Sequence, residues 1–211
     1  MATVGEIEKK TQARVVALFR DRLKYDYLGN WIDRPGNTNI EIELLTAWLK
    51  KQKVDSTLIS RALHQLNKVA GDSSKSIYDR NKEVYALLRY GVKVSPGAGE
   101  NNVTVWLVDW KNPENNHFAI AEEVTVKGAD LANAGKANTK RPDVVLYING
   151  IAVGILELKR STVSVSEGIR QNLDNQKKEF IQPFFSTIQW VMAGNNSEGL
   201  RYATVETPEK Y

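Results

Sequence analysis

Residues 141–160 read RPDVVLYINGIAVGILELKR, and this stretch places three charged side chains inside what has the pattern of a buried β-hairpin. Its two apolar runs, DVVLYI and IAVGILELK, are rich in β-branched and aliphatic residues, as is typical of strands. Asp143, Glu157 and Lys159 interrupt these runs. Ionised side chains are costly to bury unless they are paired or bound to a metal, so the stretch needs a chemical explanation.

Two carboxylates that converge on one face of a hairpin can hold a hard divalent cation such as Mg²⁺. Lys159 follows Glu157 by two positions and shares its face, because strand side chains alternate with a period of two. Two metal ligands and one cation suit phosphodiester hydrolysis, in which the metal binds phosphate and acidifies a water while the lysine orients that water or offsets charge. Asp143, Glu157 and Lys159 are therefore our candidate catalytic residues.

The register of the hairpin decides whether these side chains can meet. A two-residue loop at 149–150 pairs Asp143 with Leu156 and sends Glu157 to the opposite face. A three-residue loop, with its glycine left-handed in a G1 bulge, pairs Asp143 with Ile155 and brings the three charges to one face. We therefore predict the three-residue loop or an equivalent bulge; a type I′ turn with no downstream bulge would contradict the site.

A surface hairpin is the alternative interpretation of the same residues. Glu157 and Lys159 would then form a solvated ion pair on an edge strand. The flanking residues favour a central strand because they make both faces apolar: Val144, Val145, Leu146, Ile155, Leu156 and Leu158.

The rest of the chain divides into a helical first half and a sheet-forming second half. Helical spacing of apolar residues predicts helices at about 5–25, 40–52, 56–70 and 77–90. The third can be capped by Asp55 and Ser56 and ended by Gly71. Strands are predicted at about 103–109, 118–127, 143–148, 151–159, 187–193 and 200–205, with a helix at about 165–179. This order predicts an α/β (α+β) fold with a mixed, largely antiparallel sheet flanked by helices.

The composition is that of a globular domain without a membrane segment. Of 211 residues, 42% are hydrophobic and 26% are charged, with a net charge of +4 that permits contact with a polyanion. The absence of cysteine excludes disulfides and thiolate metal sites. With no apolar run near the roughly 18 residues of a membrane span and no apolar signal core, we expect a cytoplasmic protein.

Pro142-Asp143, the spacing of 14 residues to Glu157, and Glu157-Leu158-Lys159 resemble the PD-(D/E)xK nuclease signature. The surrounding segments extend this resemblance to essentially the whole chain. These segments are GEIEKKTQARVVALF, LTAWLKKQ, STVSVSEGIRQNLDNQ and TIQWVMAGNNSEGLRYATVETPEKY. They resemble the N-terminal endonuclease domain of the restriction (motor) subunit of type I restriction-modification enzymes.

The resemblance implies a PD-(D/E)xK nuclease core and a metal-dependent DNA endonuclease. Asp143 and Glu157 would bind Mg²⁺, Lys159 would assist catalysis, and a metal-activated water would attack the phosphodiester. In the full enzyme, cleavage follows ATP-driven translocation, at sites distant from the recognition sequence. The implied partners are double-stranded DNA and the methyltransferase (modification) and specificity subunits.

The helicase-type ATPase domains of such a motor subunit are missing from this chain. It contains no G-x-x-x-x-G-K-[ST] loop, so ATP would bind only in the absent motor domains. We expect residues 1–211 to be a single nuclease domain fragment. About 1–90 would be its helical part and about 91–211 its sheet-based catalytic core.

The resemblance implies two further contributions to the site. The family has a Gln-x-x-x-Tyr motif on the helix after the lysine; Gln171 matches its glutamine, to orient Lys159 or contact DNA, whereas Asn175 replaces its tyrosine. An early helix often adds a glutamate, and Glu8 is our candidate, with Gln12 one turn later on the same face. A solvated helix residue near the positive end of the helix dipole is the alternative for Glu8.

Four basic residues are candidates for phosphate contacts: Lys136, Lys140, Arg141 and Lys177. The first three precede Asp143 and could guide a DNA strand to the site. The alternative for these three is an ordinary polar loop, and the alternative for Lys177 is a role in surface solubility.

Two further expectations concern other parts of the chain. Trp48, Trp106, Trp110 and Trp190 fall in periodic apolar segments, so we expect them in the core. A second hypothesis for function is a non-catalytic DNA-clamping or subunit-docking module, with structural acids and the helical half as the working surface.

Overall fold

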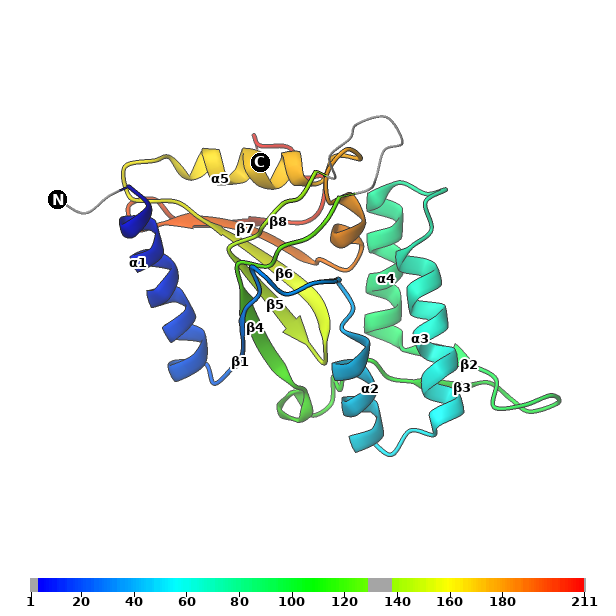
Figure 1. Cartoon of the computed structure of the whole chain (residues 1–211). Helices are drawn as coiled ribbons and strands as arrows, with labels where there is room; N and C mark the ends of the chain where they lie inside the picture. The colour runs from blue at the N-terminus through cyan, green and yellow to red at the C-terminus, as the bar shows by residue number, and fades with distance from the viewer. Residues whose placement is uncertain (1–3, 129–137, 211) are drawn as a thin grey trace.

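The computed structural model describes residues 4–128 and 138–210, with side chains described from residue 9 onward. Within these ranges the chain forms five α-helices, a six-stranded sheet and a two-stranded ribbon. Helices α1 and α5 lie on either side of the sheet, and α2, α3 and α4 stand together beside it (Figure 1). The predicted α/β fold with a helical first half and a largely antiparallel sheet is confirmed.

The sheet has the strand order β1-β4-β5-β6-β7-β8. Its strands are β1 (Asp26–Asn30), β4 (Phe118–Glu122), β5 (Val144–Ile148), β6 (Ile151–Leu158), β7 (Trp190–Asn195) and β8 (Gly199–Ala203). The β1–β4 and β6–β7 pairs are parallel, and the other pairs are antiparallel. Every residue of β6 is buried, so the surface-hairpin interpretation is wrong.

The helices begin and end close to the predicted positions, since their signals are local. They are α1 (Val4–Ala17), continued by a π-helical turn at Leu18–Arg22, then α2 (Ile42–Lys51), α3 (Ser56–Ala70), α4 (Ile77–Tyr90) and α5 (Val165–Asn175). The predicted cap of α3 is confirmed: the Asp55 side chain accepts a hydrogen bond from the Thr57 amide, and Gly71 follows the last turn. Among the described residues, no helix is long and apolar enough to cross a lipid bilayer.

The helical layer is joined to the sheet by shared core residues and by one buried amide. Helices α2 to α4 and the ribbon of β2 (Val92–Val94) and β3 (Val103–Val105) share a core that includes Ile151 of β6. The buried Asn81 side chain on α4 donates to the carbonyl oxygens of Phe185 and Ile188, at 3.0 and 2.6 Å. These bonds fix the segment that leads into β7 against α4.

Two features differ from the sequence predictions. The short strands β1 and β2 were not predicted; DYLGN in β1 lacks apolar alternation and is defined by its parallel pairing with β4. Trp48 is buried as expected, but Trp106, Trp110 and Trp190 are about half exposed, so their assignment to the core is wrong. Trp110 lies across the end of α4, where its indole N–H donates to the Leu88 carbonyl oxygen.

Candidate functional site

The tip of the β5–β6 hairpin is a two-residue turn, so the predicted three-residue loop is wrong. Asn149 and Gly150 form the loop, with φ values of +53° and +85°. Positive φ at both central positions is characteristic of a type I′ turn. The buried Asn149 side chain holds this conformation because it donates to the Leu107 carbonyl oxygen at 2.9 Å and accepts from the His117 amide at 2.7 Å.

A β-bulge downstream of the turn changes the register of the hairpin. Tyr147 pairs with Ala152, but the next pair along the ladder is Leu146 with Gly154. Val153 is therefore an additional residue of β6 without a counterpart on β5. Such a bulge shifts the remainder of its strand by one position, and this reverses the faces that its side chains occupy.

The bulge determines the face of the sheet on which Glu157 lies. After it, Val144 pairs with Leu156, so the next position on each strand places Asp143 opposite Glu157. Residues that are opposite one another in an antiparallel ladder share a face. The predicted pairing of Asp143 with Ile155 is wrong, whereas the equivalent bulge that the sequence interpretation allowed is present.

Helix α5 covers the face that carries these charges. The opposite face packs against α1 through Leu156 and Leu158. A glycine at position 168 allows α5 to approach closely, because a Cβ on Gly168 would lie 3.5 Å from the Cγ atoms of both Glu157 and Lys159. Helix α5 can therefore place polar side chains directly beside the acids of the hairpin.

Lys159 links the hairpin to α5 by hydrogen bonds. Its Nζ donates to Glu157 Oε1 at 2.7 Å and to Gln171 Oε1 at 2.8 Å. The Asp143 side chain accepts a hydrogen bond from the backbone amide of Leu158 at 2.7 Å. The structure thus brings together four of the five predicted catalytic residues, whose roles remain predictions.

The Glu157–Lys159 ion pair is removed from solvent. The Glu157 side chain is 2% exposed and that of Lys159 is 15% exposed. The desolvation of a buried ion pair often offsets its Coulombic attraction, so such a pair is weak evidence for a stabilising role. Buried charges beside a cleft are more readily explained by chemistry.

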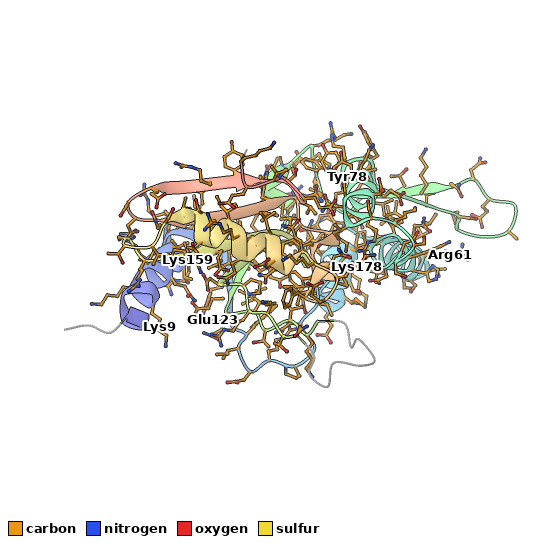
Figure 2. All side chains as sticks on the ribbon, turned by 90° about the horizontal axis from the view of Figure 1, so that it is seen from above. Lys9, Arg61, Tyr78, Glu123, Lys159 and Lys178 are labelled. Carbon is orange, nitrogen blue, oxygen red and sulfur yellow. The ribbon has the colours of Figure 1, made fainter. Side chains whose placement is uncertain are left out.

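An open cleft of about 580 Å³ lies over these side chains. Its walls combine the candidate catalytic residues with neighbouring loops: Ile32, Thr125, Thr139, Lys140, Arg141, Asp143, Glu157, Lys159 and Gln171. Figure 2 shows Lys159 beside α5, with Glu123 farther from that helix. The cleft is thus the feature through which a ligand would reach the predicted site.

Two predicted phosphate-binding residues are held in defined positions on this cleft. Lys140 Nζ lies 3.8 Å from the centroid of the Phe180 ring, which is a cation–π contact. Arg141 Nε is 2.6 Å from Glu123 Oε2. Sequence reasoning identified Lys140 and Arg141 but missed Glu123 and Phe180, because no local pattern indicates that these residues contact the two basic side chains.

The remaining predicted residues are Glu8, Lys136 and Lys177. Glu8 lies on α1, and its side chain is outside the described part of the structure; Lys136 lies outside the described residues altogether. Lys177 follows α5 and pairs with Asp174 at 2.6 Å, and it is not among the residues that line the cleft. Its DNA contact remains a prediction.

The α1 side of the sheet has its own polar cluster. Gln12, one turn after Glu8, donates to Glu122 Oε2 at 3.0 Å. The Tyr27 hydroxyl donates to Glu122 Oε1 at 2.6 Å. Partial burial, together with this bond, raises the pKa of Tyr27 to about 12, so the hydroxyl remains a donor across the neutral range. Gln12 therefore contacts Glu122 and not the acids of the cleft.

Asn175, at the position of the family's tyrosine, is the last residue of α5 and is buried. It is 1% exposed, and within the described residues its Oδ1 has no hydrogen-bond partner. Asn175 does not line the cleft. A tyrosine's proposed role at this position therefore has no equivalent here.

The donor set fits a magnesium ion. Mg²⁺ is commonly bound in proteins through one or two carboxylates, with waters and substrate phosphates completing its coordination. Asp143 and Glu157 line the same cleft and supply two carboxylates. Among the described side chains, those of residues 9–128 and 138–210, no group of three or more His, Cys, Asp or Glu could hold a metal. Among the described side chains, Asp143 and Glu157 are therefore the candidate metal ligands.

Comparison with known proteins identifies the family to which the chain is similar, and a relative. The family described as the type I restriction enzyme R protein N terminus matches residues 6–210. A protein of Methanocaldococcus jannaschii, described as the endonuclease subunit of the type I restriction enzyme MjaVIIP, is 32% identical over 109 residues. The aligned region is 50% of this chain and 9% of that protein, so the chain corresponds to a small part of its relative.

Proposed function

The chain belongs to the family of type I restriction enzyme R protein N termini, and from this premise we propose that it is a metal-dependent DNA endonuclease domain. The observation that carries the proposal is the convergence of Asp143, Glu157, Lys159 and Gln171 in one cleft. Two acids and a lysine on one sheet face provide the groups that phosphodiester hydrolysis requires.

Asp143 and Glu157 would hold Mg²⁺, which when bound supplies affinity for phosphate and a more acidic water. Lys159 contributes a positive charge at the cleft, where it offsets the charge that develops on the phosphate during attack. Gln171 accepts a hydrogen bond from this ammonium group and thereby fixes the direction in which it points. Because the pair is largely buried, its charges are weakly screened by solvent.

DNA would enter the cleft past Lys140 and Arg141. Both residues line the cleft, and they are consecutive in the chain. Basic side chains bind phosphates irrespective of base sequence, so they position a duplex without selecting a site. This agrees with a nuclease domain whose target sequence is chosen elsewhere in its assembly.

The larger assembly is part of the proposal. We propose that the domain acts in a complex with methyltransferase and specificity subunits, and that its cleavage is coupled to ATP-driven translocation by motor domains outside this chain. The family assignment to an R protein and the small fraction of the relative that this chain matches support this view.

The test compares plasmid cleavage by the assembled enzyme, with Mg²⁺ and ATP, for wild type and for Asp143→Ala, Glu157→Ala and Lys159→Ala. We expect each substitution to lower cleavage at least about 100-fold and to leave ATP hydrolysis intact. Glu83→Ala on α4, which breaks an exposed ion pair with Lys75, is the matched control. Unchanged cleavage in all three cleft variants would contradict the proposal.

A subunit-docking role is a second candidate, and it is compatible with the first. Tyr90, Trp106 and Trp110 are all about half exposed or more, and Arg89 lies 5.4 Å from the Trp110 ring centroid. Exposed aromatic residues with arginine are typical of protein interfaces. A Trp106→Ala/Trp110→Ala double variant that assembles as well as wild type would remove this candidate.

A further inference from the structure

Glu123, at the end of β4, has a backbone conformation that side chains rarely adopt. Its φ is +53°, in the left-handed region, although it is not a glycine, asparagine or aspartate. Non-glycine residues in this region are strained and persist only where the surroundings impose the conformation. Conformations of this kind cluster at active sites and ligand-binding sites.

The strain does not serve to correct the register of the β4–β5 ladder. The Glu123 amide donates to the Asp143 carbonyl oxygen at 2.9 Å, and the ladder continues to Val126 and Lys140 in the same register as before. The Glu123 and Val124 amides both donate to this strand, to the Asp143 and Pro142 carbonyl oxygens, so the left-handed residue reverses the alternation of the hydrogen bonds while the opposed residues keep their register. Its neighbour Glu122 bonds to Tyr27 and Gln12, whereas Glu123 bonds to Arg141.

The two side chains of the Glu123–Arg141 ion pair differ in their exposure to solvent. The Glu123 side chain is 15% exposed, whereas that of Arg141 is 50% exposed and contributes to the cleft wall. Glu123 binds the Nε of Arg141, at 2.6 Å, which anchors the inner part of the guanidinium. Half-exposed ion pairs add little to stability, so this pair alone does not account for the strained backbone.

We propose that Glu123 is a positioning residue that fixes the Arg141 guanidinium so that it meets a backbone phosphate of DNA beside Asp143. This inference rests on the proposed nuclease function. The same residue connects the two participants, because its amide binds the backbone of Asp143 and its carboxylate binds the side chain of Arg141.

The charge of Glu123 gives the proposal a distinctive signature. A carboxylate near bound phosphates repels them, so its removal should leave DNA affinity unchanged or increase it. Loss of a positioned guanidinium should instead slow cleavage of bound DNA. Substitution of a residue with only a structural role would not lower the cleavage rate while leaving DNA affinity unchanged or higher.

The experiment uses the assembled enzyme. Single-turnover plasmid cleavage at saturating DNA is measured with Mg²⁺, and DNA affinity is measured without Mg²⁺. We expect Glu123→Ala to lower the cleavage rate roughly tenfold, because misplacement of a substrate-positioning group is costly. Glu123→Gln should stay within about threefold of wild type, because an amide oxygen can still accept from Arg141 Nε. The affinity of either variant for DNA should not fall.

A double-variant comparison isolates the contact. In an Arg141→Ala background, Glu123→Ala should change the rate by less than about twofold, because residues that act through one contact are not additive. Glu123→Gly removes the carboxylate while relieving the backbone strain, and it should cleave as slowly as Glu123→Ala. The Glu123→Gly variant therefore keeps the test valid if Glu123→Ala folds poorly. Glu83→Ala is the control for loss of a surface carboxylate.

The outcomes distinguish this inference from the proposed function. Wild-type rates in Glu123→Ala, with cleavage lost in Asp143→Ala, would overturn the positioning role and leave the nuclease intact. An equal effect of Glu123→Ala with and without Arg141 would likewise overturn it. Full cleavage by Asp143→Ala would overturn the proposed function and this inference with it.

Discussion

Asp143 and Leu158 are joined by a 2.7 Å hydrogen bond from the backbone amide of Leu158 to Asp143 Oδ2. The bond crosses from the start of β5 to the last residue of β6, directly before Lys159. A residue predicted to bind metal therefore also fastens the strand end that carries the predicted lysine.

The two contributions of Asp143 can be separated by substitution. Asp143→Asn keeps an oxygen acceptor for the Leu158 amide but loses the charge, whereas Asp143→Ala loses both. We expect both variants to lower plasmid cleavage by the assembled enzyme at least about 100-fold, since each loses a charged ligand. Only Asp143→Ala should speed amide hydrogen exchange at Leu158. Wild-type cleavage by Asp143→Asn would contradict a metal-binding role.

Gln171 should act only through Lys159. Gln171→Leu removes the oxygen that accepts from Lys159 Nζ at 2.8 Å, and we expect a roughly tenfold slower cleavage of bound DNA because the ammonium is less well oriented. Gln171→Glu keeps an acceptor and should be affected less. The check is single-turnover cleavage in wild-type and Lys159→Met backgrounds; an undiminished Gln171→Leu effect without the lysine would show a separate role, such as a DNA contact.

Gly150→Ala should destabilise the hairpin tip. The residue has φ +85°, and a Cβ would lie 2.8 Å from the Glu41 carbonyl oxygen and 2.9 Å from the Leu45 amide. Backbone strain of about 1–3 kcal/mol and overpacking of about 1–3 kcal/mol together predict a loss of at least about 2 kcal/mol. Urea unfolding of this chain measures the difference.

Gly36→Ala is the matched control for that prediction. Gly36 also has positive φ, at +71°, but a Cβ there would have no atom within 4 Å. Only the strain term applies, so its unfolding free energy should fall by about 1–3 kcal/mol. Equal losses in the two variants would show that the contact with α2 is unimportant.

Asn81→Asp should be worse than Asn81→Ala, although it is the smaller change in shape. The amide donates to the Phe185 and Ile188 carbonyl oxygens, and an ionised carboxylate would face these acceptors with no proton to donate. We expect a loss of about 3 kcal/mol at pH 7, compared with about 1–3 kcal/mol for alanine.

The loss in Asn81→Asp should depend on pH. Burial among carbonyl oxygens would raise the pKa of the introduced carboxyl above its unfolded value. Protonation then favours the folded state, so the deficit relative to wild type should shrink as the pH falls through that raised pKa. Urea unfolding of wild type and variant from pH 7 to pH 4 tests this; a deficit that grows on acidification would contradict it.

Local signals predicted the helices but only part of the sheet. The cap at Asp55, the stop at Gly71 and the apolar spacing of the first four helices depend on neighbours in the chain. β1 was missed because it is defined by hydrogen bonds to β4, about 90 residues away. Trp106 and Trp190 were assigned to the core from apolar periodicity, which does not show whether another element covers a given face.

The sequence by itself determined which residues could perform the chemistry. Asp143, Glu157, Lys159 and Gln171 were identified from residue type, spacing and family resemblance, and the fold class followed from the order of periodic segments. These properties can be inferred from the sequence alone, because they depend on side-chain chemistry and on short-range spacing.

Only the tertiary structure decided whether those residues face one another. A single additional residue, Val153, moves Glu157 from one face of the sheet to the other, and a β-branched residue in an apolar run gives no local sign of a bulge. The sequence likewise gives no local sign that Glu123 adopts a left-handed backbone conformation. Register and side-chain direction are set by pairing between distant strands, so they arise only when the whole sheet is assembled.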